Sequence, residues 1–406
     1  MAIQADGKLV VAGISSNGSD SDFAVVRYNS DGTQDTAFGS GGKVTTDINS
    51  SADTATAVAI QPDGKIVVAG FVTGGATADF AVVRYNTDGG LDSSFGTGGK
   101  VTTDIGSSDN YATALVIQPD GKIVVAGFSP LFFAIVRYGT NGTLDPTFGA
   151  GGKVTTDFGS GTDDVRALSI QADGKLVVAG SSVNGTTSDF ALARYNTDGS
   201  LDTTFGTGGK VTTAIGSKDD NGFALAIQGD GKLVVAGNSN NGSTVVFALA
   251  RYNSNGSLDP TFGTTGTVIT DINSRPAFAT ALGVQANGKL VVGGTSFNGS
   301  NNDFVVVRYN TDGNLDNSFG GAGKVFTDFS SDSDEARALA IQGDGKLIVV
   351  GNSTIGNNFD FALAQYLGDD LQPALTISPS SLDFGTVPVG TSKDLTFTVQ
   401  NTVGEL

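Results

Sequence analysis

The sequence predicts an all-β protein, a seven-bladed β-propeller of four-stranded antiparallel blades, and three observations support this fold class. One unit recurs seven times at steps of 57 residues, with a single step of 53. Each unit contains four short strand candidates separated by turn residues. No segment keeps the 3.6-residue apolar period of a helix. The lysine that follows the first turn marks the repeat at Lys8, Lys65, Lys122, Lys175, Lys232, Lys289 and Lys346.

Each unit begins with a short apolar strand, followed by a turn such as Pro62-Asp63-Gly64. Proline presets the backbone of that turn and glycine accepts a positive φ, so a tight hairpin is expected. The second strand is an Ile-Val-Val-Ala run, and the third has the pattern Phe-Ala-Val-Val-Arg-Tyr. A long turn then leads to the fourth strand. In the second unit the strands are expected at residues 57–61, 65–70, 80–85 and 100–104.

The two middle strands are apolar on both faces, so both faces of each unit must be covered. A blade held between two other blades meets this demand, which favours a closed ring. An open β-solenoid is the alternative, although solenoid coils are usually shorter than this repeat. Seven of the eight tyrosines occupy one repeated position. We expect them, and the repeated phenylalanines, to pack between blades, with an aromatic ligand platform as the alternative interpretation.

The seventh unit is incomplete, because the sequence that would form its fourth strand is absent after Tyr366. The chain also begins inside a unit, so a closing strand would have to lie upstream of Met1 or be absent. We therefore expect a last blade of three strands with an open edge. The composition changes after residue 371, which predicts a propeller at 1–371 and a separate fragment at 372–406.

Composition excludes several classes of function. Acids outnumber bases by 41 to 23, and the net charge of −18 disfavours nucleic acid and anionic membranes as partners. The chain has no Cys and no His, which excludes disulfides, a zinc site of the usual ligands and a Ser–His or Cys–His nucleophile. No apolar stretch is long enough to span a membrane, so membrane insertion is not expected.

The repeat resembles the delta-sixty repeat, a bacterial β-propeller family without an established activity. The motifs are Ile-Gln-x-Asp-Gly-Lys, Val-Val-Ala-Gly, Phe-Ala-x-x-Arg-Tyr-Asn and Leu-Asp-x-x-Phe-Gly, and they cover about residues 1–366. A looser likeness to NHL propellers rests on the same order of strands and turns. The tail, with Leu382-Asp383-Phe384-Gly385, is similar to the start of an immunoglobulin-like domain of the abnormal-spindle and hydin type. These resemblances imply an extracellular or cell-surface bacterial protein.

The long turn of each unit resembles the second half of a calcium loop, in which oxygen ligands recur at fixed offsets. The first ligand position of that loop, however, falls on an arginine such as Arg84, which cannot bind calcium. We expect the arginine to pair instead with the last aspartate of the turn through two parallel hydrogen bonds. Calcium is the weaker alternative, and no other cofactor is expected. The pairs are Arg27–Asp35, Arg84–Asp92, Arg137–Asp145, Arg194–Asp202, Arg251–Asp259 and Arg308–Asp316.

The loops after the second strand and between blades differ in every copy, whereas the hairpins and long turns barely change. Variable polar loops in front of a constant scaffold are typical of a binding face, although neutral drift of exposed loops gives the same pattern. The candidate residues of this variable rim are Asp109, Asn110, Tyr111, Asp163, Asp164, Asp219, Asp220, Asp332, Asp334 and Glu335.

The function favoured by these observations is a non-enzymatic binding or scaffolding module that engages a protein or a glycan through the variable rim. One alternative is an Asp-dependent hydrolase or lyase acting on a carbohydrate at the central channel, since a glycosidase needs two suitably placed carboxylates. A second alternative is a purely structural spacer. The many aspartates occupy equivalent repeat positions, which indicates a structural role for most of them and no catalytic residue.

Overall fold

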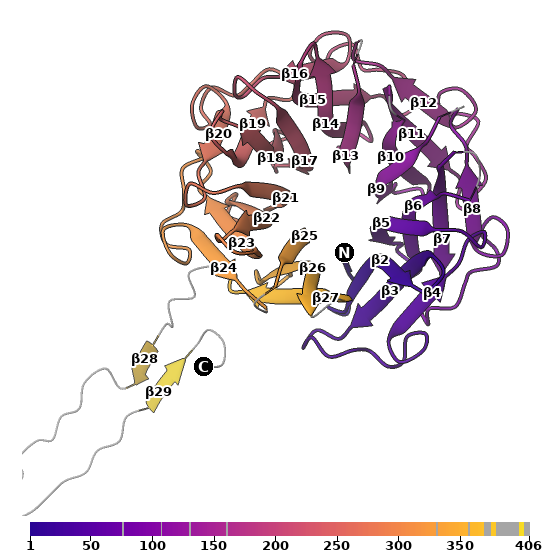
Figure 1. The fold of residues 1–406 in the computed structure, drawn as a ribbon, viewed down its shortest axis with the longest axis horizontal. Coiled ribbons are helices and arrows are strands. Elements are labelled where there is room, and N and C mark those ends of the chain that lie inside the picture. The colour runs from indigo at the N-terminus through magenta and orange to yellow at the C-terminus, as the bar shows by residue number, and fades with distance from the viewer. Residues whose placement is uncertain are drawn as a thin grey trace, which may run out of the picture.

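The computed structural model describes residues 1–74, 77–106, 108–129, 131–159, 161–329, 332–355, 358–368, 375–378 and 398–401. Seven antiparallel sheets surround a central axis, as Figure 1 shows. Blades 1 to 6 have four strands each and blade 7 has three, so the predicted fold class and the three-stranded last blade are confirmed. Each blade is a meander in which neighbouring strands follow one another along the chain.

The strands are described here by their position in the blade, from the axis outward. The innermost strands are β1 (Ala2–Ile3), β5 (Asp53–Ile60), β9 (Tyr111–Ile117), β13 (Asp163–Ile170), β17 (Asp220–Ile227), β21 (Ala277–Val284) and β25 (Asp334–Ile341). The second strands are β2 (Leu9–Ser16), β6 (Ile66–Val72), β10 (Ile123–Ser129), β14 (Leu176–Asn184), β18 (Leu233–Asn240), β22 (Leu290–Phe297) and β26 (Leu347–Ile355).

The third strands are β3 (Ser21–Tyr28), β7 (Asp79–Tyr85), β11 (Phe132–Tyr138), β15 (Thr187–Tyr195), β19 (Val245–Tyr252), β23 (Asn302–Tyr309) and β27 (Asn358–Tyr366). The outer strands are β4 (Lys43–Thr46), β8 (Lys100–Thr103), β12 (Lys153–Thr156), β16 (Lys210–Thr213), β20 (Thr267–Thr270) and β24 (Lys324–Thr327). The innermost strand of blade 2 begins at Asp53, ahead of the predicted start at residue 57, because Asp53 and Thr54 also join the ladder. The innermost strands of blades 4 to 7 extend over the same additional positions.

The predicted domain start at 372–406 lies mostly outside the described residues. Only β28 (Leu375–Ser378) and β29 (Thr398–Asn401) are described there, and they pair antiparallel. The described residues contain strands and turns, and none of them forms a helix with the length and apolarity that crossing a bilayer requires.

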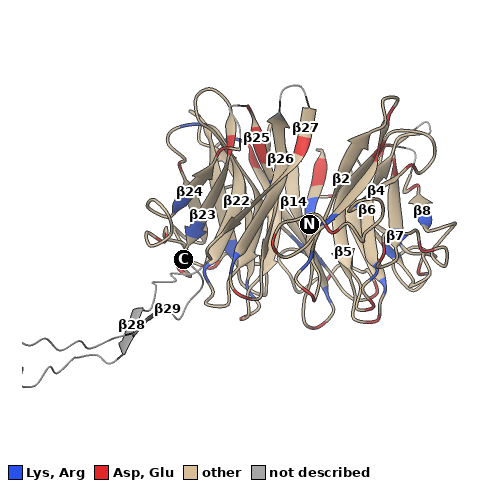
Figure 2. Ribbon diagram, turned by 90° about the horizontal axis from the view of Figure 1, so that it is seen from below, with Lys and Arg blue, Asp and Glu red and all other residues tan. Residues whose placement is uncertain are grey.

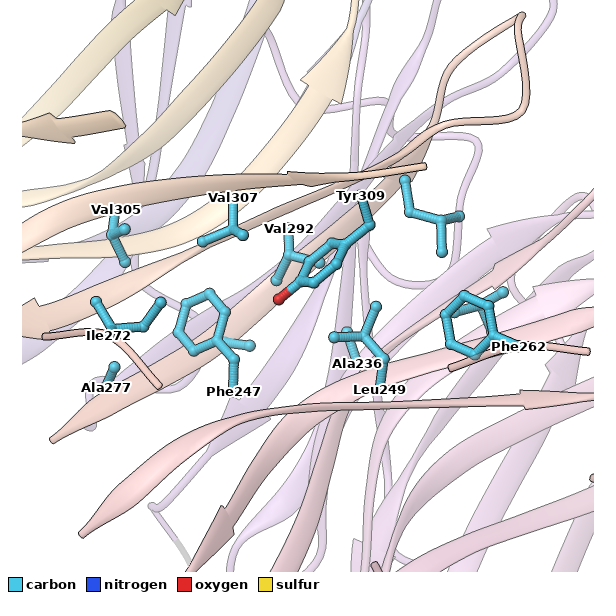
Figure 3. Packing of buried hydrophobic residues seen from close by; sticks show 13 residues of the cluster. Ala236, Phe247, Leu249, Phe262, Ile272, Ala277, Val292, Val305, Val307 and Tyr309 are labelled. Carbon is cyan, nitrogen blue, oxygen red and sulfur yellow. The ribbon is translucent and has the colours of Figure 1, made fainter. Parts of the chain in front are cut away.

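The hydrophobic core consists of separate clusters, each between two neighbouring blades. In Figure 3, Phe247 and Leu249 of blade 5 pack against Val305, Val307 and Tyr309 of blade 6. All five side chains are fully buried. Because both faces of the middle strands are apolar, each blade contributes to the cluster on either side of it.

The repeated tyrosines pack between blades, as expected, and most of them also make one hydrogen bond across the interface. The hydroxyl of Tyr85 donates to Oγ1 of Thr46 on the outer strand of the preceding blade, at 2.8 Å. Four further tyrosines donate in the same way, at 2.7 to 2.9 Å. Burial raises the pKa of Tyr85 above its usual value, so the hydroxyl keeps the proton that it donates.

The ring closes between blade 7 and blade 1, an interface that we call the seam. No strand of blade 1 is hydrogen-bonded to blade 7 among the described residues. Instead Leu9 and Val11 of β2 pack against Ile348 and Val350 of β26. Tyr28 packs at the edge of this cluster. In the part of the chain that the structure describes, blade 7 has no outer strand and so no threonine at the position that partners the other tyrosines. Among these residues, packed side chains join the two blades at the seam.

The glycine of the Val-Val-Ala-Gly motif is required by a β-bulge. The register between β5 and β6 shifts between Ala55 and Ala57, opposite Gly70. A Cβ atom on Gly70 would lie 1.9 Å from the carbonyl oxygen of Thr54 and 2.9 Å from the ring of Phe23 in the preceding blade. A side chain therefore cannot fit without displacing the backbone.

We expect Gly70→Ala to destabilise the propeller by roughly 1–3 kcal/mol, because the added methyl group overpacks this bulge. The midpoint of urea unfolding measures the effect. Gly229→Ala is the matched control, because nothing lies within 4 Å of its Cβ position and it should shift the midpoint little. Equal midpoints for the two variants would contradict this account of the bulge.

Candidate functional site

The meander topology separates two rims of the disc. The Asp-Gly-Lys hairpins and the long turns lie at one end of the strands, and we call this end the constant rim. The loops between second and third strands, and those between blades, lie at the other end and form the variable rim. Figure 2 shows the disc from its side, with the acidic starts of β25 and β27 at the variable rim. The predicted arrangement of the loops is therefore present.

On the constant rim each predicted arginine lies beside its predicted aspartate. Nε of the arginine donates to Oδ2 of the aspartate at 2.6 to 2.8 Å in all six blades that have the turn. Both side chains are buried. The predicted geometry of two parallel hydrogen bonds is wrong, however, because the guanidinium divides its donors among three partners. In blade 2 these are Asp92, the hydroxyl of Ser94 and the carbonyl oxygen of Thr140.

The bond from Nη1 joins neighbouring blades. Arg84 of blade 2 donates to Thr140 in the long turn of blade 3 at 2.5 Å, and four other arginines make the same bond at 2.5 to 2.6 Å. In blade 6, Arg308 donates to the carbonyl oxygen of Gly368 instead, which follows the last strand of blade 7. Each arginine therefore holds its own long turn and the next blade together, and we call this arrangement the arginine clip.

Two further contacts complete each clip. Nζ of Lys65 lies 2.9 Å from Oδ2 of Asp92, and the other five hairpin lysines reach their aspartates at 2.8 to 3.1 Å. The guanidinium of Arg84 also lies 4.6 Å from the ring centre of Phe95, the phenylalanine that closes the long turn. The carboxylate of Asp92 is therefore already surrounded by the donors of Lys65, Arg84 and Ser94.

We expect Arg84→Leu to destabilise the protein by roughly 3–5 kcal/mol, because it leaves the buried carboxylate of Asp92 with too few partners. Thermal unfolding followed by circular dichroism measures the loss. Gln365→Leu is the matched control: Gln365 occupies the same position in blade 7, is exposed, and bonds to Gln342. A larger loss for Gln365→Leu than for Arg84→Leu would contradict the clip.

The clip also predicts a pH dependence. Burial alone would raise the pKa of Asp92, but hydrogen bonds from Ser94 and Lys65, together with the charge of Arg84, hold it well below its usual value. A carboxyl whose pKa is lower in the folded state stabilises the protein above its unfolded pKa of about 3.9, and this stabilisation disappears as the pH falls.

The stability difference between the wild type and Asp92→Asn should therefore be constant from about pH 7 to 5 and shrink below about pH 4. Urea unfolding of both proteins across this range measures it. The comparison cancels the general effect of the acidic surface, since both proteins share it. A difference that stays constant down to about pH 2.5 would contradict the prediction.

The variable rim contains the ten candidate residues, but the structure buries four of them completely. The prediction that these four lie on the binding surface is wrong, because none of them has exposed surface. They are Asn110, Asp163, Asp220 and Asp334. They occupy one repeated position at or next to the start of the innermost strand, where the side chain turns between blades. Oδ2 of Asp163, for example, accepts the main-chain N–H of Phe158 at 2.9 Å. Through such bonds the three aspartates hold the loops between blades in place.

The other six candidates keep exposed surface. Asp219 and Asp332 are exposed, whereas Asp109, Tyr111, Asp164 and Glu335 are half-buried. Asp109 also accepts the N–H of Ala78 at 2.8 Å, and Asp219 accepts that of Ser188 at 3.0 Å, so both attach a loop of the preceding blade. Asp164 and Glu335 form ion pairs with Arg166 and Arg337.

A row of rings and one guanidinium lies at the inner edge of the variable rim. Phe71 and Tyr111 meet edge to face with ring centres 4.8 Å apart, and the ring of Phe128 lies 5.4 Å beyond that of Tyr111. The guanidinium of Arg166 lies 5.4 Å from the ring centre of Phe128 and 5.9 Å from that of Phe223. We call these five residues the aromatic row, and it extends over blades 2 to 5.

The sequence analysis found only Tyr111 of this row. The repeated rings were considered as a platform and are instead buried between blades. The signal that could have revealed the row is irregularity: Tyr111 is the one tyrosine outside the repeated position, and Phe71, Phe128 and Phe223 replace smaller residues found in other copies.

Two groups of three carboxylates lie close enough together to hold a metal ion in the part of the chain that the structure describes. They are Asp22, Asp47 and Asp53, and Asp303, Asp328 and Asp334. Of these six residues the sequence analysis singled out only Asp334. A depression of about 600 Å³ lies on the constant rim between blades 5 and 6, and its lining includes Lys232 and Arg251, which the clip already uses.

These features define a repeat propeller with one constant and one variable rim. The chain belongs to the family described as "Domain of unknown function (DUF5122) beta-propeller", which matches more than half of it. The matched residues are 4–38, 61–95, 118–148, 171–205, 228–262, 285–319 and 342–370. None of the curated proteins matches this chain.

Several solved structures have a similar fold. A streptogramin B lyase is 12% identical, with 84% of this chain and 94% of that chain covered and a TM-score of 0.50. The polysaccharide lyase Uly1 is 12% identical over 90% and 89% of the two chains, with a TM-score of 0.48. A protein of unknown function from Bacteroides caccae is 15% identical over 77% and 95%, with a TM-score of 0.43. At these identities the likeness shows the fold alone.

Proposed function

We propose that this propeller is a non-enzymatic binding module that engages a neutral glycan through the inner edge of its variable rim. The aromatic row is the observation that carries the proposal. The exported or cell-surface location implied by the family resemblance is part of the same proposal, and so is a scaffolding role among neighbouring domains.

The row combines the two kinds of group that a sugar needs. All four rings are half-buried, so each is fixed by packing and still offers surface to a ligand. Rigid aromatic side chains of this kind bury much apolar area at low cost in conformational entropy, which suits stacking on the apolar face of a sugar ring. Arg166 is exposed and paired with Asp164, so donors and acceptors for sugar hydroxyls lie beside the rings.

Charge favours a neutral ligand over an anionic one. The chain has a net charge of −18, and the guanidinium of Arg166 is already paired with Asp164 at 2.6 Å. A polyanion would meet a repulsive surface and no unpaired cation in the row. A protein partner is the competing occupant, because aromatic and arginine side chains also dominate protein interfaces.

The carbohydrate hydrolase or lyase remains an alternative prediction with less support. Asp164 and Glu335, the half-buried acids on the innermost strands, are each paired with an arginine. Asp53, an acid whose pKa burial raises to about 6, is completely buried, so it cannot reach a substrate. No observation specifically favours the structural spacer.

Binding of the full chain to an array of neutral oligosaccharides, followed by calorimetry on the best ligand, tests the proposal. We expect Tyr111→Ala and Phe128→Ala each to weaken binding by roughly tenfold, since an aromatic contact contributes about 1 kcal/mol and often more. Phe359→Ala is the matched control, because Phe359 is 76% exposed in blade 7, away from the row.

Two results would overturn the proposal. The first is glycan binding that Tyr111→Ala and Phe128→Ala leave unchanged. The second is the absence of binding to any neutral glycan together with saturable binding of a protein ligand that the same variants abolish. Turnover of a bound glycan by the wild-type protein would favour the enzyme alternative.

A further inference from the structure

Three repeated positions meet at each interface between blades on the variable rim. The first precedes the phenylalanine of the third strand, the second follows the outer strand, and the third begins the innermost strand of the next blade. Between blades 1 and 2 these positions hold Asp22, Asp47 and Asp53, spaced by 25 and 6 residues. Between blades 6 and 7 the same spacing brings together Asp303, Asp328 and Asp334. In each group, which we call an acid triad, one oxygen of every carboxylate lies within 4.8 Å of the other two.

The other interfaces have each lost at least one acid of the three. Asn110 replaces the third between blades 2 and 3, Phe132 the first between blades 3 and 4, and Ala214 the second between blades 4 and 5. Between blades 5 and 6 both Val246 and Ala277 are apolar. Complete triads are therefore specific to two interfaces and are not a requirement of the fold.

Two acids of the first triad are buried and only half satisfied. Asp53 has no exposed surface and Asp22 is 7% exposed. Oδ2 of Asp53 accepts the N–H of Ile48 at 2.7 Å, and Oδ2 of Asp22 accepts Nδ2 of Asn17 at 3.2 Å. Oδ1 of each is buried without a hydrogen-bond partner. On the neighbouring strand Asp53 faces Val72, whose side chain can donate no hydrogen bond.

The second triad repeats this arrangement. Oδ2 of Asp334 accepts the N–H of Phe329 at 2.7 Å, and Oδ2 of Asp303 accepts Nδ2 of Asn298 at 2.9 Å. Oδ1 of Asp303 and Oδ1 of Asp334 are again buried without a partner. Unpaired buried carboxylate oxygens are costly, and Oδ1 of Asp163 and of Asp220 is unpaired at interfaces without a complete triad as well. What distinguishes the two triads is that these oxygens lie beside two further carboxylates, an arrangement that a positive partner would satisfy.

The electrostatics of the first triad also favour a positive partner. Burial is the main cause that raises the pKa of Asp53 to about 6; the N–H of Ile48 opposes this rise, and the nearby charges of Asp47, Asp22 and Asp20 contribute to it. Lys100 lies near this triad, and its Nζ donates to the main-chain carbonyl of Asp47 at 2.5 Å. Three carboxylates thus converge on one point, where a cation would relieve both their mutual repulsion and the loss of solvation.

We propose that each acid triad binds one calcium ion, which joins blade 1 to blade 2 and blade 6 to blade 7. Carboxylate oxygens are hard ligands and suit Ca²⁺ or Mg²⁺. Mg²⁺ demands near-ideal octahedral geometry and usually keeps several of its waters, whereas Ca²⁺ accepts irregular sets of six to eight oxygens. Two of the three acids of each triad are buried between blades, which leaves little room for retained waters and favours calcium.

The position of the two sites gives them a structural role. Blades 7 and 1 meet at the seam, where packed side chains join them and the described residues share no strand. Blade 7 also has Gln365 where other blades have the clip arginine. The triads lie at the two interfaces on either side of this pair of blades. Calcium would therefore attach the least well-anchored blades to the rest of the ring at the variable rim.

Calorimetric titration of the metal-free full chain with Ca²⁺ tests the proposal. We expect two ions per chain for the wild type, one for Asp22→Asn, one for Asp303→Asn and none for the double variant. Each bound ion should also raise the melting temperature, and a chelator should reverse the rise. An Asp→Asn change keeps the shape of the side chain and one of its two oxygens, and it removes one negative charge from the site.

Asp189→Asn is the matched control. Asp189 occupies the position of Asp22 between blades 4 and 5, where Ala214 replaces the second acid, so this variant should still bind two ions. Circular dichroism shows whether each variant is folded. Absence of Ca²⁺ binding to the wild type, or two ions bound to the double variant, would overturn the proposal. Tighter binding of Mg²⁺ than of Ca²⁺ would overturn the choice of metal.

Discussion

The structure depends on one constraint, which is that both faces of every blade are apolar and must be covered. The middle strands of each sheet contribute fully buried Val, Ile, Leu and Ala side chains to clusters on either side. Neither face of such a sheet can be left exposed to water, so each unit needs a neighbour on both faces and the array must close. The seam shows how strong this demand is, because it closes by packing of residues such as Leu9 and Ile348 without a shared strand.

The two rims satisfy their polar groups in different ways. On the constant rim each buried arginine uses its donors on its own aspartate, on a nearby hydroxyl and on the next blade, while a lysine gives the aspartate a further partner. This network satisfies the buried arginine and aspartate of each clip and leaves them little chemistry for a ligand to complete, although Oε1 of Gln61 and of Gln118 on the same rim is buried without a hydrogen-bond partner. On the variable rim, Oδ1 of Asp22 and Oδ1 of Asp53 are buried without a partner, and four rings stay half-exposed. Binding capacity is therefore concentrated where the scaffold is incomplete.

The same contrast explains which parts of the site could be predicted. Arg84 and Asp92 belong to one unit, eight residues apart, and both positions are lost together in the seventh unit, so their pairing could be inferred. The hydrogen bond from Nη1 of Arg84 could not be predicted, because its acceptor, the carbonyl oxygen of Thr140, lies in the next blade. The burial of Asp163 was likewise missed: its exposure depends on a strand that begins earlier than its apolar residues suggest.

The sequence alone determined the number of blades, the missing outer strand of blade 7 and the residues that pack between sheets. Each of these follows from a repeat of fixed length whose apolar positions recur in every copy. Only the tertiary structure decided which irregular residues meet. Phe71, Tyr111 and Phe128 form a row, and Asp22 and Asp53 form part of a triad, because blades pack face to face and bring together positions from different units. A one-dimensional period contains no information on such contacts, since it fixes the neighbours within a unit and not those across an interface.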